Sequence, residues 1–242
     1  MKNYWLLLKA DLKRLYQMRV FMLVVIVSFV LGVATGLFPF LNPANALYVS
    51  VFILPVLIFS FSLQFEINNQ ESLPKTDRPI SAAVFLLSKI TSAVLIQLIP
   101  LLFIIIALVF IRGHKANYPA LVGVYLLGIL NHIVIGLSLS IISKSYRILP
   151  LSYLVYLLVF CVAPIFFSNG LIPLKLQYFL VFSPAYLSGV LIDNLLAANI
   201  YSPLWLLLLS VFLQIAYTVL LCLFVINPFF KAYISKNLIE TE

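Results

Sequence analysis

Six apolar runs, each close to the length that a helix needs to cross a bilayer, constrain this chain more than any other feature. A spanning helix takes about 20 mainly apolar residues, and the runs cover residues 20–37, 46–65, 90–111, 120–142, 148–167 and 204–226. Strands of membrane barrels are about 10 residues long and alternate in polarity, so runs of this length predict helices. Only 9% of the residues are charged, against about 25% in soluble domains. The sequence therefore predicts an all-α integral membrane protein with one transmembrane domain, residues 1–242.

The segment before the first run, residues 1–19, has the pattern of an amphipathic helix. Trp5, Leu8 and Leu12 fall on one side of a helical projection, and Lys9 and Lys13 fall mostly on the other. Such a pattern predicts a helix that lies in the membrane interface. The alternative is that this segment simply extends the first span.

The cations indicate how the chain is oriented. Twelve of the fifteen Lys and Arg residues lie in the N-terminal segment, between runs two and three, between runs four and five, or after run six. Because cytoplasmic loops carry the excess of Lys and Arg, both termini are expected in the cytoplasm. The net charge of +8 is interpreted as this topological signal, and no nucleic-acid partner is expected.

The longest polar interruption, residues 66–89, falls on the predicted cytoplasmic side. It contains Glu66, Glu71 and Asp77, which are three of the seven acidic residues. Residues 80–89 predict a short helix on the membrane surface that precedes the third span. Our functional interpretation is a docking surface for a partner outside the membrane, and the alternative is an ordinary solvated loop.

The segment between the last two runs, residues 168–202, contains one further helix signal. Ser183 followed by Pro184 is typical of a helix start, but the apolar stretch that follows is too short to span. We expect a re-entrant or interfacial helix there, with Asp193 facing water. Inside the first run, Gly32 and Gly36 form a G-x-x-x-G pattern that predicts close helix packing.

The chain offers little for catalysis. No set of three or four convergent metal ligands is visible, and no glycine is followed by lysine, so the P-loop of ATPases is absent. We therefore expect a non-enzymatic chain with no catalytic residue, metal or cofactor of its own. His132, at mid-depth in the fourth run, is expected to be a neutral histidine bonded to a neighbouring helix; a transport role is the alternative.

At residues 66–89 the sequence resembles the permease subunits of ABC exporters of the ABC-2 type. That family places a glutamate at the end of the second span, then Gly-Thr, a proline with a small hydroxyl residue, and a lysine that opens the third span. Here Glu66, Pro79, Ser81 and Lys89 take these places, whereas Asn69, Gln70 and Glu71 stand where Gly-Thr is expected. The elbow-like N-terminal segment, the six spans and the Ser183–Pro184 region extend the resemblance over the whole chain.

The resemblance implies a two-permease pathway, homodimeric or heterodimeric, in a bacterial plasma membrane. Two cytoplasmic ATPase subunits, which bind ATP and Mg, would dock on the loop and drive transport, and the first, second and fifth spans would line the pathway. The expected cargo is amphipathic or apolar: a drug, an antimicrobial peptide or a lipid-like molecule. The implied coupling residues are Glu66, Glu71, Asp77, Arg78, Pro79, Ser81 and Lys89.

Two other functions remain open at this point. The first is the substrate-binding membrane subunit of a vitamin uptake system, which would dock through small residues on its first span. The second is a membrane protein without a transport role, such as an immunity or sensor protein, which would need no ATPase.

Overall fold

A computed structural model describes residues 2–38, 42–68, 81–196 and 202–239, and all regular structure in these ranges is helical. Six helical stretches in the described residues are long and apolar enough to cross a membrane. The elements are α1 (Lys2–Gln17), α2 (Val20–Leu37), α3 (Pro43–Tyr48), η1 (Val49–Ile53), α4 (Leu54–Asn68), α5 (Ala82–Ile106), η2 (Ala107–Ile111), α6 (Tyr118–Ser143), α7 (Leu149–Tyr156), η3 (Leu157–Cys161), α8 (Val162–Ser168), η4 (Leu174–Leu176), α9 (Gln177–Leu180), α10 (Pro184–Leu196), α11 (Leu204–Leu221), η5 (Cys222–Ile226) and α12 (Asn227–Ile239).

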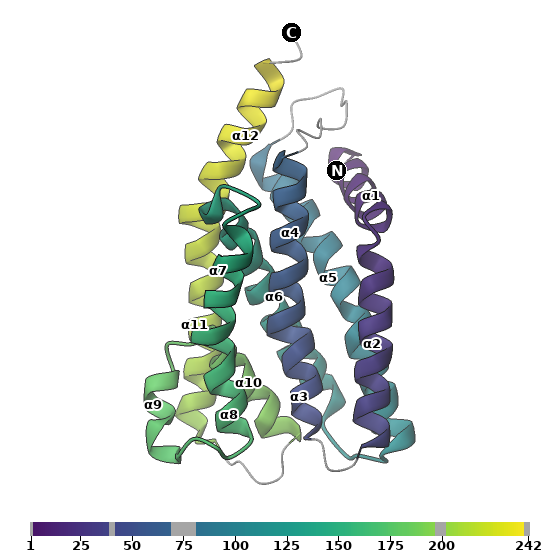
Figure 1. Ribbon diagram of the computed structural model, residues 1–242, viewed down its shortest axis with the longest axis vertical. Helices are drawn as coiled ribbons and strands as arrows, with labels where there is room; N and C mark the ends of the chain where they lie inside the picture. Colours follow the sequence, from purple (N-terminus) through teal and green to yellow (C-terminus); the bar gives the residue numbers. More distant parts are fainter. Residues whose placement is uncertain (1, 39–41, 69–80, 197–201, 240–242) are drawn as a thin grey trace.

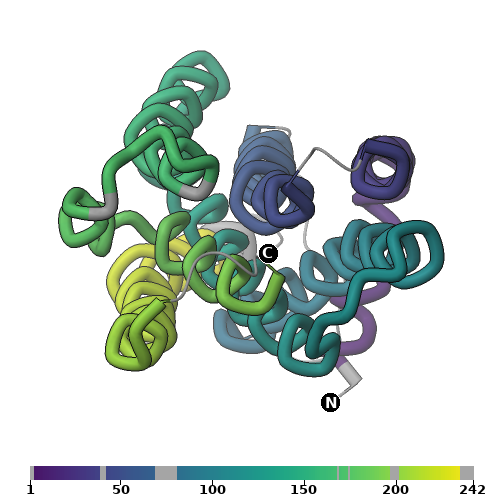
Figure 2. The backbone as a smooth tube through the Cα atoms, turned by 90° about the horizontal axis from the view of Figure 1, so that it is seen from below, coloured from purple at the N-terminus to yellow at the C-terminus, as the bar shows by residue number. Residues whose placement is uncertain are grey.

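The helices form one bundle around α6 (Figures 1 and 2). α6 packs against α4, α5, α10 and α11, while α2 and α1 lie on the outer side of α5. α1, α12 and the α6–α7 turn lie at one end of the bundle, together with the end of α4 and the start of α5 (Figure 1). We call this the terminal end, and the end that carries α3, α8 and α9 the opposite end.

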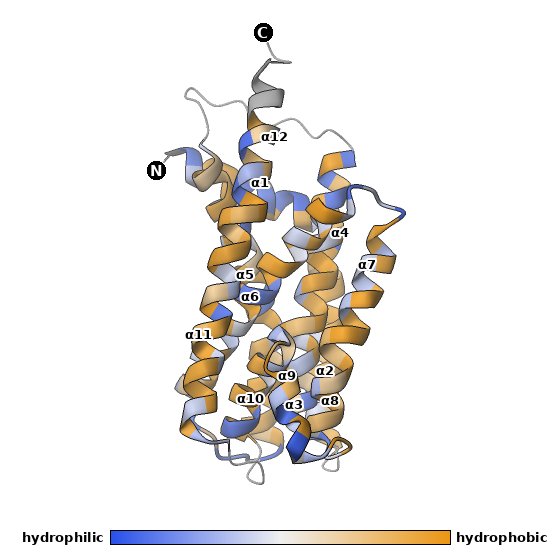
Figure 3. Cartoon of the chain, turned by 90° about the vertical axis from the view of Figure 1, so that its left-hand side faces the viewer, coloured by the Kyte–Doolittle hydropathy of each residue, from blue (hydrophilic) through white to orange (hydrophobic). Residues whose placement is uncertain are grey.

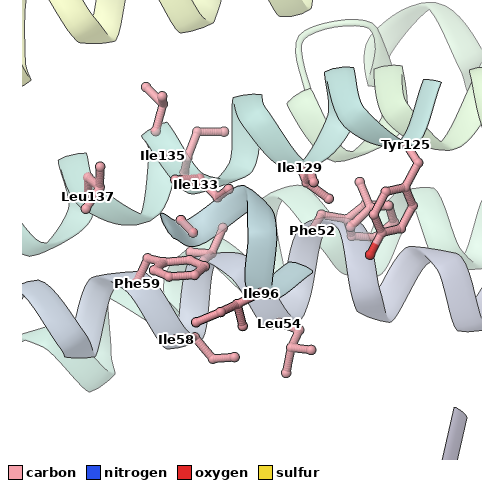
Figure 4. Close-up of a cluster of buried hydrophobic side chains, with 14 of the residues drawn as sticks. Phe52, Leu54, Ile58, Phe59, Ile96, Tyr125, Ile129, Ile133, Ile135 and Leu137 are labelled. Carbon is pink, nitrogen blue, oxygen red and sulfur yellow. The ribbon is translucent and has the colours of Figure 1, made fainter. Parts of the chain in front are cut away.

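The core of the bundle is apolar, and so is its outer surface. Buried side chains from α4, α5 and α6 interdigitate, among them Phe59, Ile96 and Ile133 (Figure 4). Large apolar side chains are also exposed along the sides of the bundle, where Figure 3 is mostly orange. In water such a surface would be unfavourable, whereas lipid chains solvate it well. The predicted all-α protein with six candidate spans is therefore confirmed.

Local sequence explains where several helices begin. Asn42 accepts a hydrogen bond from the Ala44 amide at 3.0 Å, and Asn117 accepts one from the Ala120 amide at 3.2 Å. Each of these side chains satisfies an amide that has no partner within its own helix. Arg19, with a φ of 58°, separates α1 from α2.

Prolines account for three of the wide-turn segments. Pro55, Pro164 and Pro228 each follow a π-helical segment, and in each case the carbonyl four residues earlier belongs to that segment. A proline has no N–H and its ring clashes with this carbonyl, so a wider turn accommodates it. The carbonyl of Phe160, which Pro164 leaves free in this way, accepts a hydrogen bond from the Ser183 hydroxyl at 2.7 Å.

Two predicted helix boundaries were wrong. Residues 82–89 are the start of α5 and not a separate surface helix, because Ser81 caps α5 directly and no break follows. The last span was predicted to end at residue 226, but the helix continues past it as α12. The wide turn η5 accommodates Pro228, and beyond it Phe230 and Ile234 are buried against the bundle.

The short helix between the last two spans packs inside the bundle. α10 packs against α6, α11, α3 and α8, so it enters the bundle at the opposite end. Asp193, which was expected to face water, is buried with 4% of its surface exposed. Asp193 lies on the side of α10 that packs against the bundle, whereas the adjacent Asn194 is exposed.

Close contact between α4 and α6 at Gly136 gives a test of this packing. A Cβ atom at Gly136 would lie 3.1 Å from the Val56 backbone, whereas one at Gly123, also on α6, would meet nothing within 4 Å. We expect Gly136→Leu to destabilise the protein by about 1–3 kcal/mol, and Gly123→Leu to leave it unchanged. Thermal unfolding in detergent measures both variants, and equal stability of the two would contradict this helix packing.

Candidate functional site: a buried charge cluster

Two acidic and two basic side chains meet at the terminal end of the bundle. They are Asp11 and Arg14 on α1, Glu66 near the end of α4, and Lys89 two turns into α5. We call these four residues the charge cluster. Glu66 lies two residues before the end of α4, and Lys89 lies seven residues after the start of α5.

Lys89 is bonded to both carboxylates. Its Nζ atom lies 2.6 Å from Glu66 Oε2 and 3.1 Å from Asp11 Oδ1. Its alkyl chain and ammonium group also lie against Phe85, with Nζ 4.7 Å from the ring centroid. Charge-assisted hydrogen bonds and a cation–π contact thus fix the lysine head group.

Arg14 repeats this bridging role from α1. One guanidinium nitrogen lies 3.0 Å from Asp11 Oδ1, and another contacts Glu66 Oε2. The Ser88 hydroxyl lies 3.4 Å from Asp11 Oδ2. Each carboxylate therefore contacts both cations, and the four formal charges sum to zero.

The cluster is buried, and its neutrality is what makes that burial tolerable. Asp11, Glu66 and Lys89 expose 6%, 4% and 5% of their surfaces. Removing a single ionised group from water costs several kcal/mol unless an opposite charge and hydrogen bonds replace the water. A cavity of about 20 Å³ beside Arg14, Glu66 and Lys89 has room for one water molecule.

Aromatic side chains connect the cluster to the C-terminal helix. The Phe85 ring, which carries the Lys89 ammonium on one side, packs edge-on against Phe230 of α12 with 5.1 Å between centroids. Tyr233 of α12 stacks on the same ring at 6.4 Å. The cluster and its immediate neighbours thus hold four helices together: α1, α4, α5 and α12.

The predicted coupling residues are only partly within the described residues. Glu66 and Lys89 are brought together in the cluster, and Ser81 caps α5 by accepting from the Val84 amide at 3.3 Å. Glu71, Asp77, Arg78 and Pro79 lie outside the described residues. The sequence analysis did not identify Asp11 and Arg14. Their spacing of three residues indicates an ion pair on one helix face, but it does not show that the pair is buried.

Gly32 and Gly36 face inward on α2. A Cβ atom at Gly32 would lie 3.2 Å from the Phe103 carbonyl of α5, and one at Gly36 would lie 2.7 Å from the Ile111 side chain of η2. The G-x-x-x-G pattern therefore lies in the contact of α2 with α5 and η2 of the same chain.

A second group of polar side chains lies deeper in the bundle. The Asn131 amide donates to the Gln214 carbonyl at 2.8 Å and to the Thr218 hydroxyl at 3.0 Å, and Ser188 donates to Gln214 Oε1 at 2.9 Å. These bonds join α6, α10 and α11. Gln214 lies in the sixth apolar run and Ser188 in the short apolar stretch after Pro184, and neither gave a sequence signal of its own.

His132 was expected to bond to a neighbouring helix, but it does not. Its Nδ1 atom lies 2.8 Å from the Gly128 carbonyl of its own helix, and its ring packs against Phe52 and Tyr156. Gly128 is one helical turn away, so the local carbonyl is the nearest partner available. Within the described residues, no group of three or more His, Cys, Asp and Glu is placed to hold a metal ion.

Comparison with protein-family models, with curated proteins and with solved structures finds no match to this chain.

The stability of the protein should depend on the charge cluster as a unit. We expect Lys89→Met to lower the free energy of unfolding by about 3–5 kcal/mol, because it leaves two buried carboxylates that share one cation, Arg14. Glu66→Gln with Lys89→Met restores neutrality, so the double variant should lose less than the sum of the two single losses.

Unfolding in mixed detergent micelles measures each variant, with Lys9→Met as the matched control. Lys9 is exposed on the same helix as Asp11 and Arg14, so its loss should change stability by less than about 0.5 kcal/mol. Additive single losses, or equal effects of Lys9→Met and Lys89→Met, would contradict the cluster.

Proposed function

We propose that this chain is the membrane-spanning subunit of an ATP-driven exporter of the ABC-2 type. The observation that carries the proposal is the charge cluster, in which Glu66 of α4 and Lys89 of α5, the helices before and after the polar segment in the sequence, both bond to α1. A segment that receives force from a soluble partner must be fastened to the helices that move. The Glu66–Lys89 bond and its two partners on α1 provide that attachment.

The proposed orientation places the terminal end in the cytoplasm. The N-terminal segment, residues 66–89, the α6–α7 turn and the segment after the last span carry twelve of the fifteen Lys and Arg residues. The described parts of these segments lie at one end of the bundle (Figures 1 and 3). Cytoplasmic ATPases would therefore meet residues 69–80 from that side.

α1 serves as the elbow helix in this proposal. Leu7 and Leu15 are buried against the bundle, while Trp5 and Tyr16 are 62% and 68% exposed. The exposed aromatic rings suit the headgroup region of a bilayer. Tyr4 also bonds to Thr91 of α5 at 3.0 Å, so α1 and α5 would shift together when the ATPases close.

We expect the spans to bend at the π-helical segments during such a shift. η1 interrupts the second span, and its Phe52 and Ile53 carbonyls accept weak hydrogen bonds from Tyr156 and Tyr153 of α7 at 3.4 and 3.3 Å. Wide helical turns of this kind are frequent at functional sites. Force applied at Glu66 would pass along α4 to η1, and from there to the fifth span.

A second permease subunit, identical or related, would complete the pathway, and the ATP and Mg would be held by two partner ATPases. The cargo we propose is amphipathic or apolar, because few charged side chains lie within the spans. Gly32 and Gly36 are occupied by contacts with α5 and η2. They are therefore not free to dock an uptake partner, which weighs against a vitamin uptake subunit.

The proposal predicts that the chain purifies with a P-loop ATPase from its native membrane. Reversing two charges, Glu71→Lys with Asp77→Lys, should reduce the ATPase recovered at least tenfold, because these carboxylates would face basic groups on the partner. Quantitative mass spectrometry of the affinity-purified complex, with ATP turnover of the same fractions, provides the measurement.

The matched control reverses two charges at the opposite end, Lys115→Glu with Lys175→Glu. Both lysines are exposed, and neither would contact a cytoplasmic partner, so ATPase recovery should stay at the wild-type level. Recovery of the wild-type chain without an ATPase would contradict the proposed function. Loss with the control pair, and none with Glu71→Lys and Asp77→Lys, would mean that the orientation is reversed.

A further inference from the structure

A groove between α2 and α4 is left unfilled by the chain's own side chains. α2 packs on α5 and α4 packs on α6, so the two helices stand apart, as Figure 2 shows. The space between them is about 620 Å³, within the range of about 300–1,000 Å³ that small-molecule sites occupy. It is lined by Met18, Arg19, Val20, Met22, Leu23, Ile26, Val27, Leu57, Ile58, Phe61, Ser62 and Tyr146.

The groove has the depth of one membrane leaflet. Its α2 wall extends from Arg19, directly before the candidate span, to Val27. At a rise of about 1.5 Å per residue these eight steps cover roughly 12 Å. The hydrocarbon half of a bilayer is about 15 Å thick. A ligand that fills the groove would thus reach from the headgroup level nearly to the midplane.

The wall residues are apolar along this depth, and only the mouth is charged. Ser62 is the single hydroxyl among the α4 residues of the lining, and it is 3% exposed. At the mouth, Tyr146 packs edge-on against Phe61 at 5.8 Å. The groove therefore offers an apolar slot for a chain-like group and a polar rim at one end.

The rim carries positive charge that the described residues do not neutralise. Arg19 lines the mouth, and Lys144 and Arg147 flank Tyr146 in the α6–α7 turn; all three are exposed. The only described carboxylates at the terminal end are Asp11 and Glu66, and both are buried in the charge cluster. An anionic group at the mouth would meet cations without a competing carboxylate from the described chain.

We propose that this groove binds one acyl chain of an anionic phospholipid, with the lipid phosphate against Arg19. An acyl chain matches the apolar slot and its depth, and the phosphate matches the guanidinium, which donates hydrogen bonds in a fork geometry. Lys144 and Arg147 add attraction at the same level of the membrane. The site is independent of the proposed exporter function, since it needs neither an ATPase nor a second permease.

The test is native mass spectrometry of the full chain released from nanodiscs that contain equal amounts of phosphatidylglycerol and phosphatidylcholine. The wild-type chain should retain phosphatidylglycerol preferentially, with one molecule per chain as the most persistent adduct. Arg19→Gln should lower the preference for phosphatidylglycerol about fivefold, whereas Lys175→Gln, at the opposite end, should not change it.

A second pair of variants tests the slot itself. Ile26 lines the groove and is 59% exposed, whereas Val30 is one turn further along α2, is 58% exposed and does not line it. Ile26→Trp should fill the groove and abolish the persistent lipid adduct, while Val30→Trp should keep it. Both substitutions replace an exposed apolar side chain, so neither should disturb folding.

Three results would overturn the proposal. The first is equal retention of the two lipids by the wild-type chain. The second is retention of phosphatidylglycerol by Ile26→Trp at the wild-type level. The third is a dimer without bound lipid that dissociates in the Ile26→Trp variant but not in the Val30→Trp variant. In that case the groove would hold a second copy of the chain.

Discussion

A charge inside a helical bundle that faces lipid needs a partner of opposite sign, and this requirement governs the terminal end of the protein. Lys89 and Arg14 satisfy it with the same two carboxylates, Asp11 and Glu66. These residues come from three helices, so neutralising the charges also fixes α1, α4 and α5 relative to one another. Phe85 contacts both Lys89 and Phe230, so the position of α12 is also fixed relative to the cluster.

Backbone groups impose a second requirement, since a carbonyl without a partner is costly in lipid. Pro55 and Pro164 each free a carbonyl, and the wide turns before them are stabilised from other helices. Ser183 bonds to the Phe160 carbonyl, and Tyr156 bonds to the Phe52 carbonyl. The charge cluster and these wide turns lie at different depths of the bundle.

The sequence predicted the spans well because their signal is local. The span at residues 20–37 was predicted at the bounds that α2 has, since Arg19 and the end of the apolar run mark both limits. The continuation of the last helix past Pro228 was not predicted, because it depends on the burial of Phe230 against Phe85 from a distant helix. The burial of Asp193 likewise depends on how α10 enters the bundle.

Only two of the four residues of the charge cluster could be predicted from the sequence. Glu66 and Lys89 stood out because each interrupts or borders an apolar run. Asp11 and Arg14 sat among other charges of an amphipathic segment, where nothing local distinguishes a buried ion pair from a solvated one. His132 was noticed for its depth, but its partner, the Gly128 carbonyl of the same helix, followed from side-chain packing.

The central claim is that α1 and α5 move as one unit because the charge cluster holds them together. A pulsed electron paramagnetic resonance distance between spin labels at Lys9→Cys and Leu87→Cys tests it, with the two native cysteines replaced by alanine. Both labelled positions are exposed. We expect one narrow distance distribution that does not change when the proposed complex with the ATPases binds ATP, and a broad distribution when Lys89→Met is added. A distance between α1 and α5 that changes with nucleotide in the intact protein would contradict it.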